Sequence, residues 1–100
     1  MAAVIVSYPA APEARFDRAY YVATHLPLVE QVFAPHGLTE ASAYFPDGDG
    51  AAILALAVLR FRDAAARDAA LAHPDAAEAF GDIPNFTDAQ PVATTVSEAA

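Results

Sequence analysis

The chain has 100 residues, which is the usual size of one domain, so we expect a single domain over residues 1–100. Its composition is 56% hydrophobic and 18% charged, and the formal net charge is −8 with no lysine. A chain this acidic repels phosphate groups, so nucleic acids and anionic membrane surfaces are not expected as partners.

The sequence has no cysteine, which excludes disulfides, thiol nucleophiles and thiolate metal ligands. The longest apolar run, residues 51–59, is far shorter than the roughly 20 residues that a membrane-spanning helix needs. The opening residues, MAAVIVSYP, lack the basic segment of a signal peptide. We therefore expect a cytoplasmic protein.

The first predicted element is a strand over residues 3–8, AVIVSY. A short run rich in β-branched residues favours a strand, and a proline follows it directly. Ile5 lies on one face of this strand and Val4 and Val6 lie on the other, so we expect both faces to be apolar.

Residues 13–36 have the spacing of a helix. Gly37 is suited to end this helix, while Pro27 should kink or break it around His25 and Leu26. One stripe of the helix recurs every four residues and consists of Tyr21, His25, Val29 and Phe33.

A hairpin is predicted next. Residues 38–46 form a weaker strand, and the Asp-Gly pairs at 47–50 are typical of the turn between two strands. The third strand, residues 51–61, is apolar on both faces. Its first face holds Ile53, Ala55, Ala57, Leu59 and Phe61, and its second face holds Leu54, Leu56 and Val58.

The last third of the chain predicts a second helix and a fourth strand. The alanine-rich stretch 63–73 opens with Asp63 as a candidate cap, and residues 75–80 suit one further turn. Residues 81–85 are typical of a loop. Residues 86–96 are expected to form the last strand, with Pro91 indicating a sheet edge or a bulge.

The predicted order is β-α-β-β-α-β, which is the ferredoxin-like α+β arrangement with a four-stranded antiparallel sheet. Two helices cover only one face of such a sheet, and the other face is normally polar in a monomer. Here the first and third strands are apolar on both faces, so part of the sheet would be left exposed. We therefore expect a homodimer formed through the open face of the sheet.

Four stretches of the sequence together resemble one known family. The first helix carries FDRAYY at residues 16–21, followed by HLPLV at 25–29. DIPNFTD at 82–88 is followed by Pro91-Val92, and the first strand ends in Tyr8-Pro9. In this order, and over nearly the whole chain, these motifs resemble the EthD-like family, which is named after the degradation of ethyl tert-butyl ether.

The resemblance implies a dimeric α/β barrel, in which two ferredoxin-like subunits pack sheet to sheet. Relatives in that wider group include cofactor-independent monooxygenases, muconolactone isomerases, polyketide cyclases and small decarboxylases. Their pockets lie between the sheet and the helices of each subunit. The resemblance thus implies a small, often aromatic or lactone-like ligand, but it selects no single reaction.

His25 is the main candidate for chemistry, because an imidazole among aromatic residues suits a general acid or base. The alternative is a structural histidine that bonds a backbone carbonyl freed by Pro27. Tyr21 lies one turn before His25, and Asp82 would either fix the imidazole tautomer or only cap a turn. The predicted catalytic set is therefore His25, Tyr21 and Asp82.

Four further aromatic residues are candidate ligand contacts, namely Tyr8, Phe33, Tyr44 and Phe86. His36 and His73 each lie at a predicted helix end, where a positive charge is favoured. No two of the three histidines are spaced to share one face of a helix, so we expect no metal site.

Two hypotheses of function follow. The first is a cofactor-independent enzyme that transfers a proton on a small cyclic or aromatic ketone, enol or lactone. The second is a non-catalytic binding or accessory dimer that sequesters an intermediate of a catabolic pathway. No cofactor is expected in either case, although a haem-binding variant of the fold is a third alternative.

Overall fold

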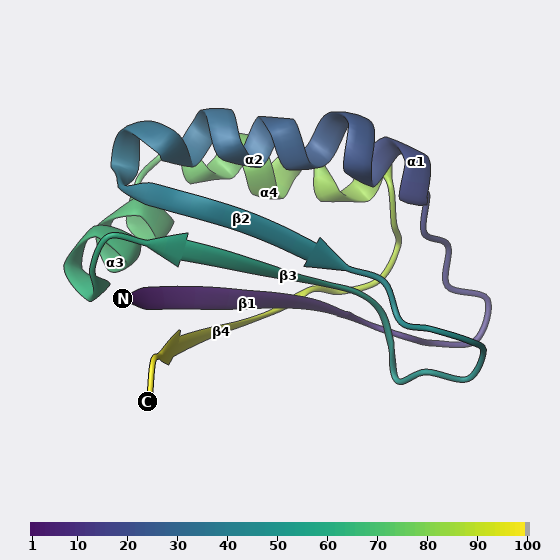
Figure 1. Ribbon diagram of the computed structural model, residues 1–100. Helices are drawn as coiled ribbons and strands as arrows, with labels where there is room; N and C mark the ends of the chain where they lie inside the picture. The colour runs from purple at the N-terminus through teal and green to yellow at the C-terminus, as the bar shows by residue number, and fades with distance from the viewer. Residues whose placement is uncertain (100) are drawn as a thin grey trace.

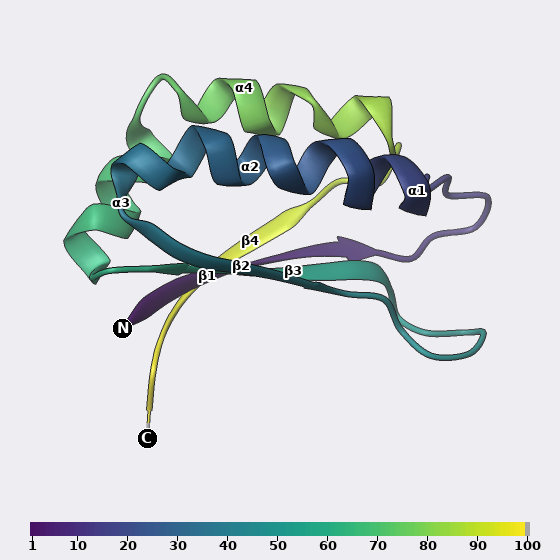
Figure 2. The same cartoon turned by 45° about the horizontal axis from the view of Figure 1, so that its top comes forward.

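The computed structural model describes residues 1–99 and has two layers, with the helices packed on one face of a sheet (Figures 1 and 2). The sheet order is β2-β3-β1-β4, and every neighbouring pair of strands is antiparallel. This order confirms the predicted ferredoxin-like sheet. The strands are β1 (Ala2–Pro9), β2 (Leu38–Tyr44), β3 (Ile53–Phe61) and β4 (Val92–Ser97).

The first helical rod starts later than the sequence predicted. It begins at Arg18 instead of Glu13, because Glu13 has a left-handed φ of 64° and Asp17 caps the helix by accepting the Tyr20 N–H at 3.0 Å. The rod comprises α1 (Arg18–Tyr20), the π-helical turn η1 (Tyr21–His25), α2 (Leu26–Phe33) and the 3₁₀ turn η2 (Ala34–His36).

Pro27 does not break this rod, which runs on through η1 into α2 (Figure 1), and the irregularity before Pro27 is the π-helical turn that ends at His25. Pro27 lies in the first turn of α2, directly after the widened π-helical turn, in which the Leu26 N–H bonds the Tyr21 carbonyl. Single π-helical turns occur inside α-helices without ending them. The predicted end is confirmed, since Gly37 follows the last turn with a left-handed φ of 95°.

The second group of helices covers the rest of the same sheet face. Asp63 caps α3 (Ala64–Ala72) by accepting the Ala66 N–H at 2.7 Å, as its position predicted. The further turn is present as α4 (Ala76–Gly81), which lies beside α2 in Figure 2. The expected loop contains a short 3₁₀ turn, η3 (Ile83–Asn85).

The last strand is shorter than predicted, because β4 begins at Val92 and residues 86–91 lie outside the sheet. Phe86 and Thr87 are instead held by the segment before α1. The Asp17 N–H donates to the Phe86 carbonyl at 2.8 Å, and the Thr87 hydroxyl donates to the Arg15 carbonyl at 2.6 Å. β4 pairs with β1 at the edge of the sheet, as expected from Pro91.

Both faces of the two central strands are apolar. The face toward the helices carries buried residues of β1 and β3: Val4, Val6, Tyr8, Ala55, Ala57, Leu59 and Phe61. The opposite face carries the partly exposed Ile5, Leu54, Leu56 and Val58, and Figure 2 shows no helix on that side. Within residues 1–99, no helix has the length and apolar character to cross a membrane.

Candidate functional site

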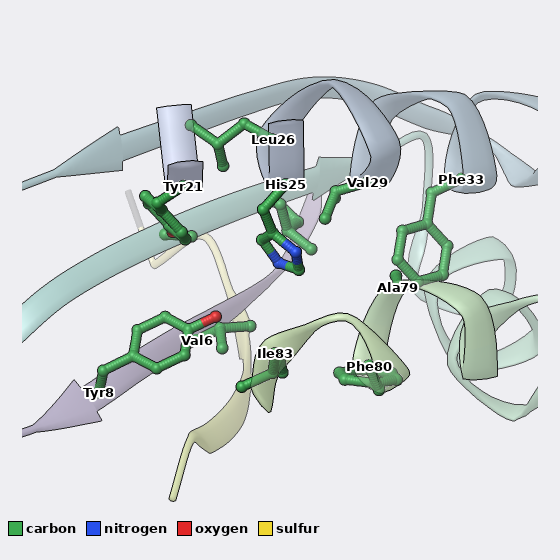
Figure 3. A pocket seen from close by; sticks show the side chains of 12 residues that line it. Val6, Tyr8, Tyr21, His25, Leu26, Val29, Phe33, Ala79, Phe80 and Ile83 are labelled. Atoms are coloured by element: carbon green, nitrogen blue, oxygen red, sulfur yellow. The ribbon is translucent and has the colours of Figure 1, made fainter. Parts of the chain in front are cut away.

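A small cavity lies between the sheet and the helices α2 and α4 (Figure 3). Its volume is about 20 Å³, which is close to the space that one water molecule occupies. The side chains that line it are Val6, Tyr8, Tyr21, His25, Leu26, Val29, Phe33, Ala57, Leu59, Ala79, Phe80 and Ile83. All four residues of the helix stripe noted in the sequence are among them.

His25 and Asp82 form the polar centre of this site. Nδ1 of His25 lies 3.0 Å from Oδ2 of Asp82, and the two side chains are 5% and 10% exposed. His25 is the last residue of η1 and Asp82 directly follows α4, so the pair joins two helices that are distant in the sequence. The His25 ring also packs on Phe86, with ring centroids 4.5 Å apart.

Two further side chains hold the other carboxylate oxygen of Asp82. The Tyr20 hydroxyl donates to Oδ1 at 2.7 Å, and the Asn85 amide donates to Oδ1 at 3.0 Å. Of the two roles expected for Asp82, the contact with His25 is the orienting one, whereas its side chain does not cap the 3₁₀ turn that follows. The Asp82 carboxylate therefore contacts three side chains, those of Tyr20, His25 and Asn85.

The charge state of the pair follows from these contacts. Burial acts to raise the pKa of Asp82, but the hydrogen bonds from Asn85, Tyr20 and His25 outweigh it, so this pKa is lowered. Burial lowers the pKa of His25 below its ordinary 6.5, and Asp82 offsets this only in part. At neutral pH the pair is thus a carboxylate beside a neutral imidazole.

A carboxylate can only accept hydrogen bonds, so Nδ1 of His25 must carry the proton of the neutral ring. Nε2 then holds a free lone pair on a ring that lines the cavity. This arrangement leaves one basic nitrogen in an apolar pocket, and Asp82 stabilises the ring when Nε2 takes up a proton.

Two buried tyrosines flank the imidazole. The Tyr21 ring stacks on His25 with centroids 5.6 Å apart, and its buried hydroxyl has no hydrogen-bond partner among residues 1–99. Burial raises the pKa of Tyr21 to about 12 and also raises that of Tyr8. Both hydroxyls are therefore protonated donors, and Figure 3 shows the hydroxyl of Tyr8 directed toward the middle of the pocket.

The structure places the other candidate ligand contacts in three different ways. Phe33 lines the cavity, whereas Phe86 is fully buried behind His25 and supports it. Tyr44 lies outside the site. It pairs with Leu56 on the open face of the sheet and is 52% exposed, because strand alternation turns it away from the helices.

Sequence reasoning missed Tyr20 and Asn85 as the residues that hold Asp82. Asn85 follows Asp82 by three residues, a spacing typical of turn chemistry that could have indicated the contact. Tyr20 gives no such signal, because it meets Asp82 only through the packing of α1 against the end of α4.

The other two histidines come together at a different place. His36 and His73 have ring centroids 4.3 Å apart, although they lie on different elements. The spacing argument that led us to expect no metal site compared positions along single helices, so it did not cover this contact.

A second hollow adjoins the cavity and shares Phe80 and Ile83 with it. It is an open depression of about 380 Å³, bordered mainly by the loop that runs from Pro84 to Pro91. Phe80 is 38% exposed, so its ring lies at the boundary between cavity and hollow.

The architecture and the site can be compared with known proteins. No family model matches the sequence, and no curated protein matches it. Among solved structures, an EthD family protein of Bacillus halodurans C-125 has a TM-score of 0.76 at 17% identity, with 98% of each chain covered. A dimeric ferredoxin-like protein of Jannaschia sp. CCS1 has a TM-score of 0.66 at 16% identity, covering 97% of this chain and 98% of its own.

These two likenesses are at low identity and support the fold alone. A third is stronger. An EthD-like protein of Ralstonia eutropha JMP134 has a TM-score of 0.82 at 30% identity, covering 99% of this chain and 92% of its own. Identity at this level over nearly the whole of both chains confirms the resemblance seen in the sequence motifs, and the chain belongs to the EthD-like family.

Proposed function

We propose that the chain binds a small, mainly apolar molecule carrying a carbonyl or enol oxygen, and that His25 transfers a proton on it. The observation that carries this proposal is the pairing of a free Nε2 lone pair with an unpartnered, fully buried Tyr21 hydroxyl in one apolar cavity. A buried hydroxyl without a partner costs about 1–3 kcal/mol, so a ligand acceptor that meets it gains affinity.

The proton transfer balances within these residues. Nε2 of His25 takes a proton from a carbon next to the ligand carbonyl, and the electron pair moves onto the oxygen. Tyr21 donates a hydrogen bond to that oxygen, while Asp82 stabilises the imidazolium. Return of the proton from Nε2 to the same or another carbon completes an exchange or an isomerisation.

Ligand access to this site requires movement. The cavity alone has room for about one water molecule, whereas ligand pockets are usually several hundred Å³. The adjoining hollow of about 380 Å³ is separated from it by Phe80 and Ile83. We propose that rotation of the exposed Phe80 ring joins the two spaces into one site.

We also propose a homodimer through the open face of the sheet. That face presents Ile5, Leu54, Leu56 and Val58, together with Val92, which is 48% exposed. Covering such a surface favours self-association, and a second copy is its simplest complement. The dimeric ferredoxin-like protein of Jannaschia supports this proposal. The cytoplasmic location expected from the sequence stays a prediction.

A non-catalytic accessory dimer is the second candidate, and it uses the same pocket. The buried Tyr21 hydroxyl supports this candidate too, because a hydrogen bond to a ligand acceptor needs no proton transfer by His25. This candidate predicts stabilisation by a bound ligand with no turnover.

The test is proton exchange in D₂O. Small cyclic and aromatic ketones and lactones are incubated with the protein, and loss of their α-proton signals is followed by NMR. His25→Asn keeps a donor for Asp82 but removes Nε2, so we expect exchange to fall about 10²–10⁴-fold. Glu30→Gln, on the exposed side of α2, is the control and should retain full exchange.

The outcomes separate the candidates. Exchange lost in His25→Asn, with the melting temperature and dimer retained, supports catalysis by His25. Exchange at the wild-type rate in this variant refutes it. Ligand-dependent stabilisation without exchange in the wild-type protein selects the accessory dimer, and a collapse of stability in His25→Asn selects a structural role.

A further inference from the structure

A second cluster of donor atoms lies at the end of the first helical rod, and we propose that it binds a divalent transition metal ion, with zinc as the expected ion. The cluster consists of His36 in η2, His73 at the end of α3 and Asp75 at the start of α4. None of the three lines the cavity around His25, so this proposal is independent of the proposed function.

The donor atoms already have nearly the spacing of a metal site. Nε2 of His36 lies 3.0 Å from Oδ2 of Asp75, and Nδ1 of His73 lies 3.4 Å from the same oxygen. One donor atom from each residue lies within 4.8 Å of the others. Tetrahedral zinc with bonds of about 2.0–2.1 Å places its donors about 3.3 Å apart, so a small closure of the two rings suffices.

The protonation states suit coordination as well. Nδ1 of His73 accepts the backbone N–H of Asp75 at 3.0 Å, so it carries a lone pair directed toward Asp75. Nε2 of His36 must donate to the Asp75 carboxylate, because a carboxylate only accepts. Metal binding therefore replaces the proton on Nε2 of His36 and releases it to solvent, and it takes the Nδ1 lone pair of His73 from its hydrogen bond with the Asp75 N–H, which is left to solvent.

The chemistry of the donor set indicates which ion is preferred. Two imidazoles and one carboxylate are typical ligands of zinc, with water completing the coordination. The side chains of His36, His73 and Asp75 are 21%, 43% and 57% exposed, so solvent reaches the remaining position. Copper(II) should bind more tightly than zinc, and magnesium or calcium should bind poorly to this nitrogen-rich set.

Ordinary surface contacts explain each half of the cluster but not their convergence. An ion pair accounts for His36 beside Asp75, and the hydrogen bond from the Asp75 backbone N–H accounts for His73. Exposed ion pairs contribute only about 0–1 kcal/mol and do not require a second imidazole in contact with the first. A shared metal ion explains why both rings converge on one oxygen.

Calorimetric titration with zinc chloride tests the proposal, using the full chain without a histidine tag. We expect one ion per chain. His36→Ala and Asp75→Asn should each weaken binding more than about tenfold, since loss of even an outer-shell partner of a metal costs about 10–100-fold. The matched control is Glu78→Gln, which removes an acid of α4, the helix that begins directly after Asp75.

NMR of the imidazole nitrogens provides a second readout that does not depend on affinity. Zinc should shift the signals of His36 and His73 and leave those of His25 in place. The proposal is overturned if zinc does not bind, if several ions bind weakly and equally in all variants, or if Asp75→Asn and His36→Ala both bind like the wild-type protein while remaining folded by circular dichroism.

Discussion

At the scale of single residues, His25 is controlled by two neighbours with opposite effects. Burial against Phe86 and Tyr21 favours the neutral ring, while Asp82 favours the charged ring. Burial has the larger effect, so the pKa of His25 is lowered and the ring is a base near neutral pH. Because Asp82 fixes the orientation of the imidazole ring, its basic nitrogen Nε2 has a defined direction.

The same shift predicts how stability depends on pH. Because the pKa of His25 is lower in the folded chain than its ordinary 6.5, folded protein binds protons less readily than unfolded protein. The contribution of His25 is therefore fully present above pH 6.5 and is lost as pH falls through the folded pKa. Urea unfolding between pH 7.5 and 5.5 should show this loss. In His25→Asn the free energy of unfolding should change less steeply with pH. If the free energy of unfolding depended on pH equally in the wild-type protein and in His25→Asn, the lowered pKa of His25 would be contradicted.

The two tyrosines next to each other in the sequence should respond to phenylalanine in opposite ways. Tyr21→Phe removes a buried hydroxyl that has no hydrogen-bond partner in the described part of the chain, so stability should stay equal or rise by up to about 1–3 kcal/mol. Tyr20→Phe removes a donor to Asp82 and should lower stability. Chemical denaturation of both variants measures this, and a loss of stability in Tyr21→Phe would show that its hydroxyl has a partner in the protein.

At the scale of elements, the sequence predicted what depends on local pattern. The β-branched run of β1, the two apolar faces of β3 and the cap at Asp63 were all correct, because each follows from neighbouring residues. The late start of the rod at Arg18 and the short β4 were missed. The short β4 results from long-range contacts in which residues 15–17 hold residues 86–88 outside the sheet, whereas the late start follows from the left-handed Glu13 and the cap at Asp17.

The candidate site was predicted in the same uneven way. The helix stripe placed Tyr21, His25 and Phe33 on one face, since a period of four defines one face, and all three line the cavity. Tyr44 was assigned by residue type alone, and the strand register moved it to the opposite face. The contacts of Asp82 with His25 and Tyr20 join segments that are distant in sequence, so no spacing rule could give them.

The end of the first rod makes a clear stability prediction. Gly37 has a φ of 95°, and a Cβ there would lie 3.0 Å from the Cβ of Ala66. Gly37→Ala should therefore cost at least about 1–2 kcal/mol. Gly81→Ala is the control, because a Cβ at Gly81 meets nothing within 4 Å. Thermal unfolding of the two variants should separate them, and an equal melting temperature would refute the strain at Gly37.

At the scale of the whole molecule, the sheet separates two surfaces with different proposed roles. Its covered face builds the cavity with α2 and α4, and its open face carries the apolar surface proposed for the dimer. A subunit contact on the open face leaves the pocket of each copy free. The EthD-like fold thus permits association and ligand binding without competition between them.

This separation predicts a matched pair of variants. Val58→Asp places a charge in the middle of the open face, while Val22→Asp places the same charge on the outer side of η1, where Val22 is already 53% exposed. Light scattering after gel filtration should show a monomer for Val58→Asp and a dimer for Val22→Asp. A monomeric wild-type protein, or a dimer that survives Val58→Asp, would refute association through this face.

The central claim is that Asp82 holds His25 as a neutral base with Nε2 free in the pocket, and nitrogen NMR of the labelled imidazole tests it most directly. At pH 7.5 we predict a neutral ring protonated on Nδ1, which titrates below its ordinary pKa of 6.5. Asp82→Asn should lower that pKa further, because the charge that favours the imidazolium is lost. A ring protonated on Nε2, or an imidazolium that persists at pH 7.5, would contradict the account.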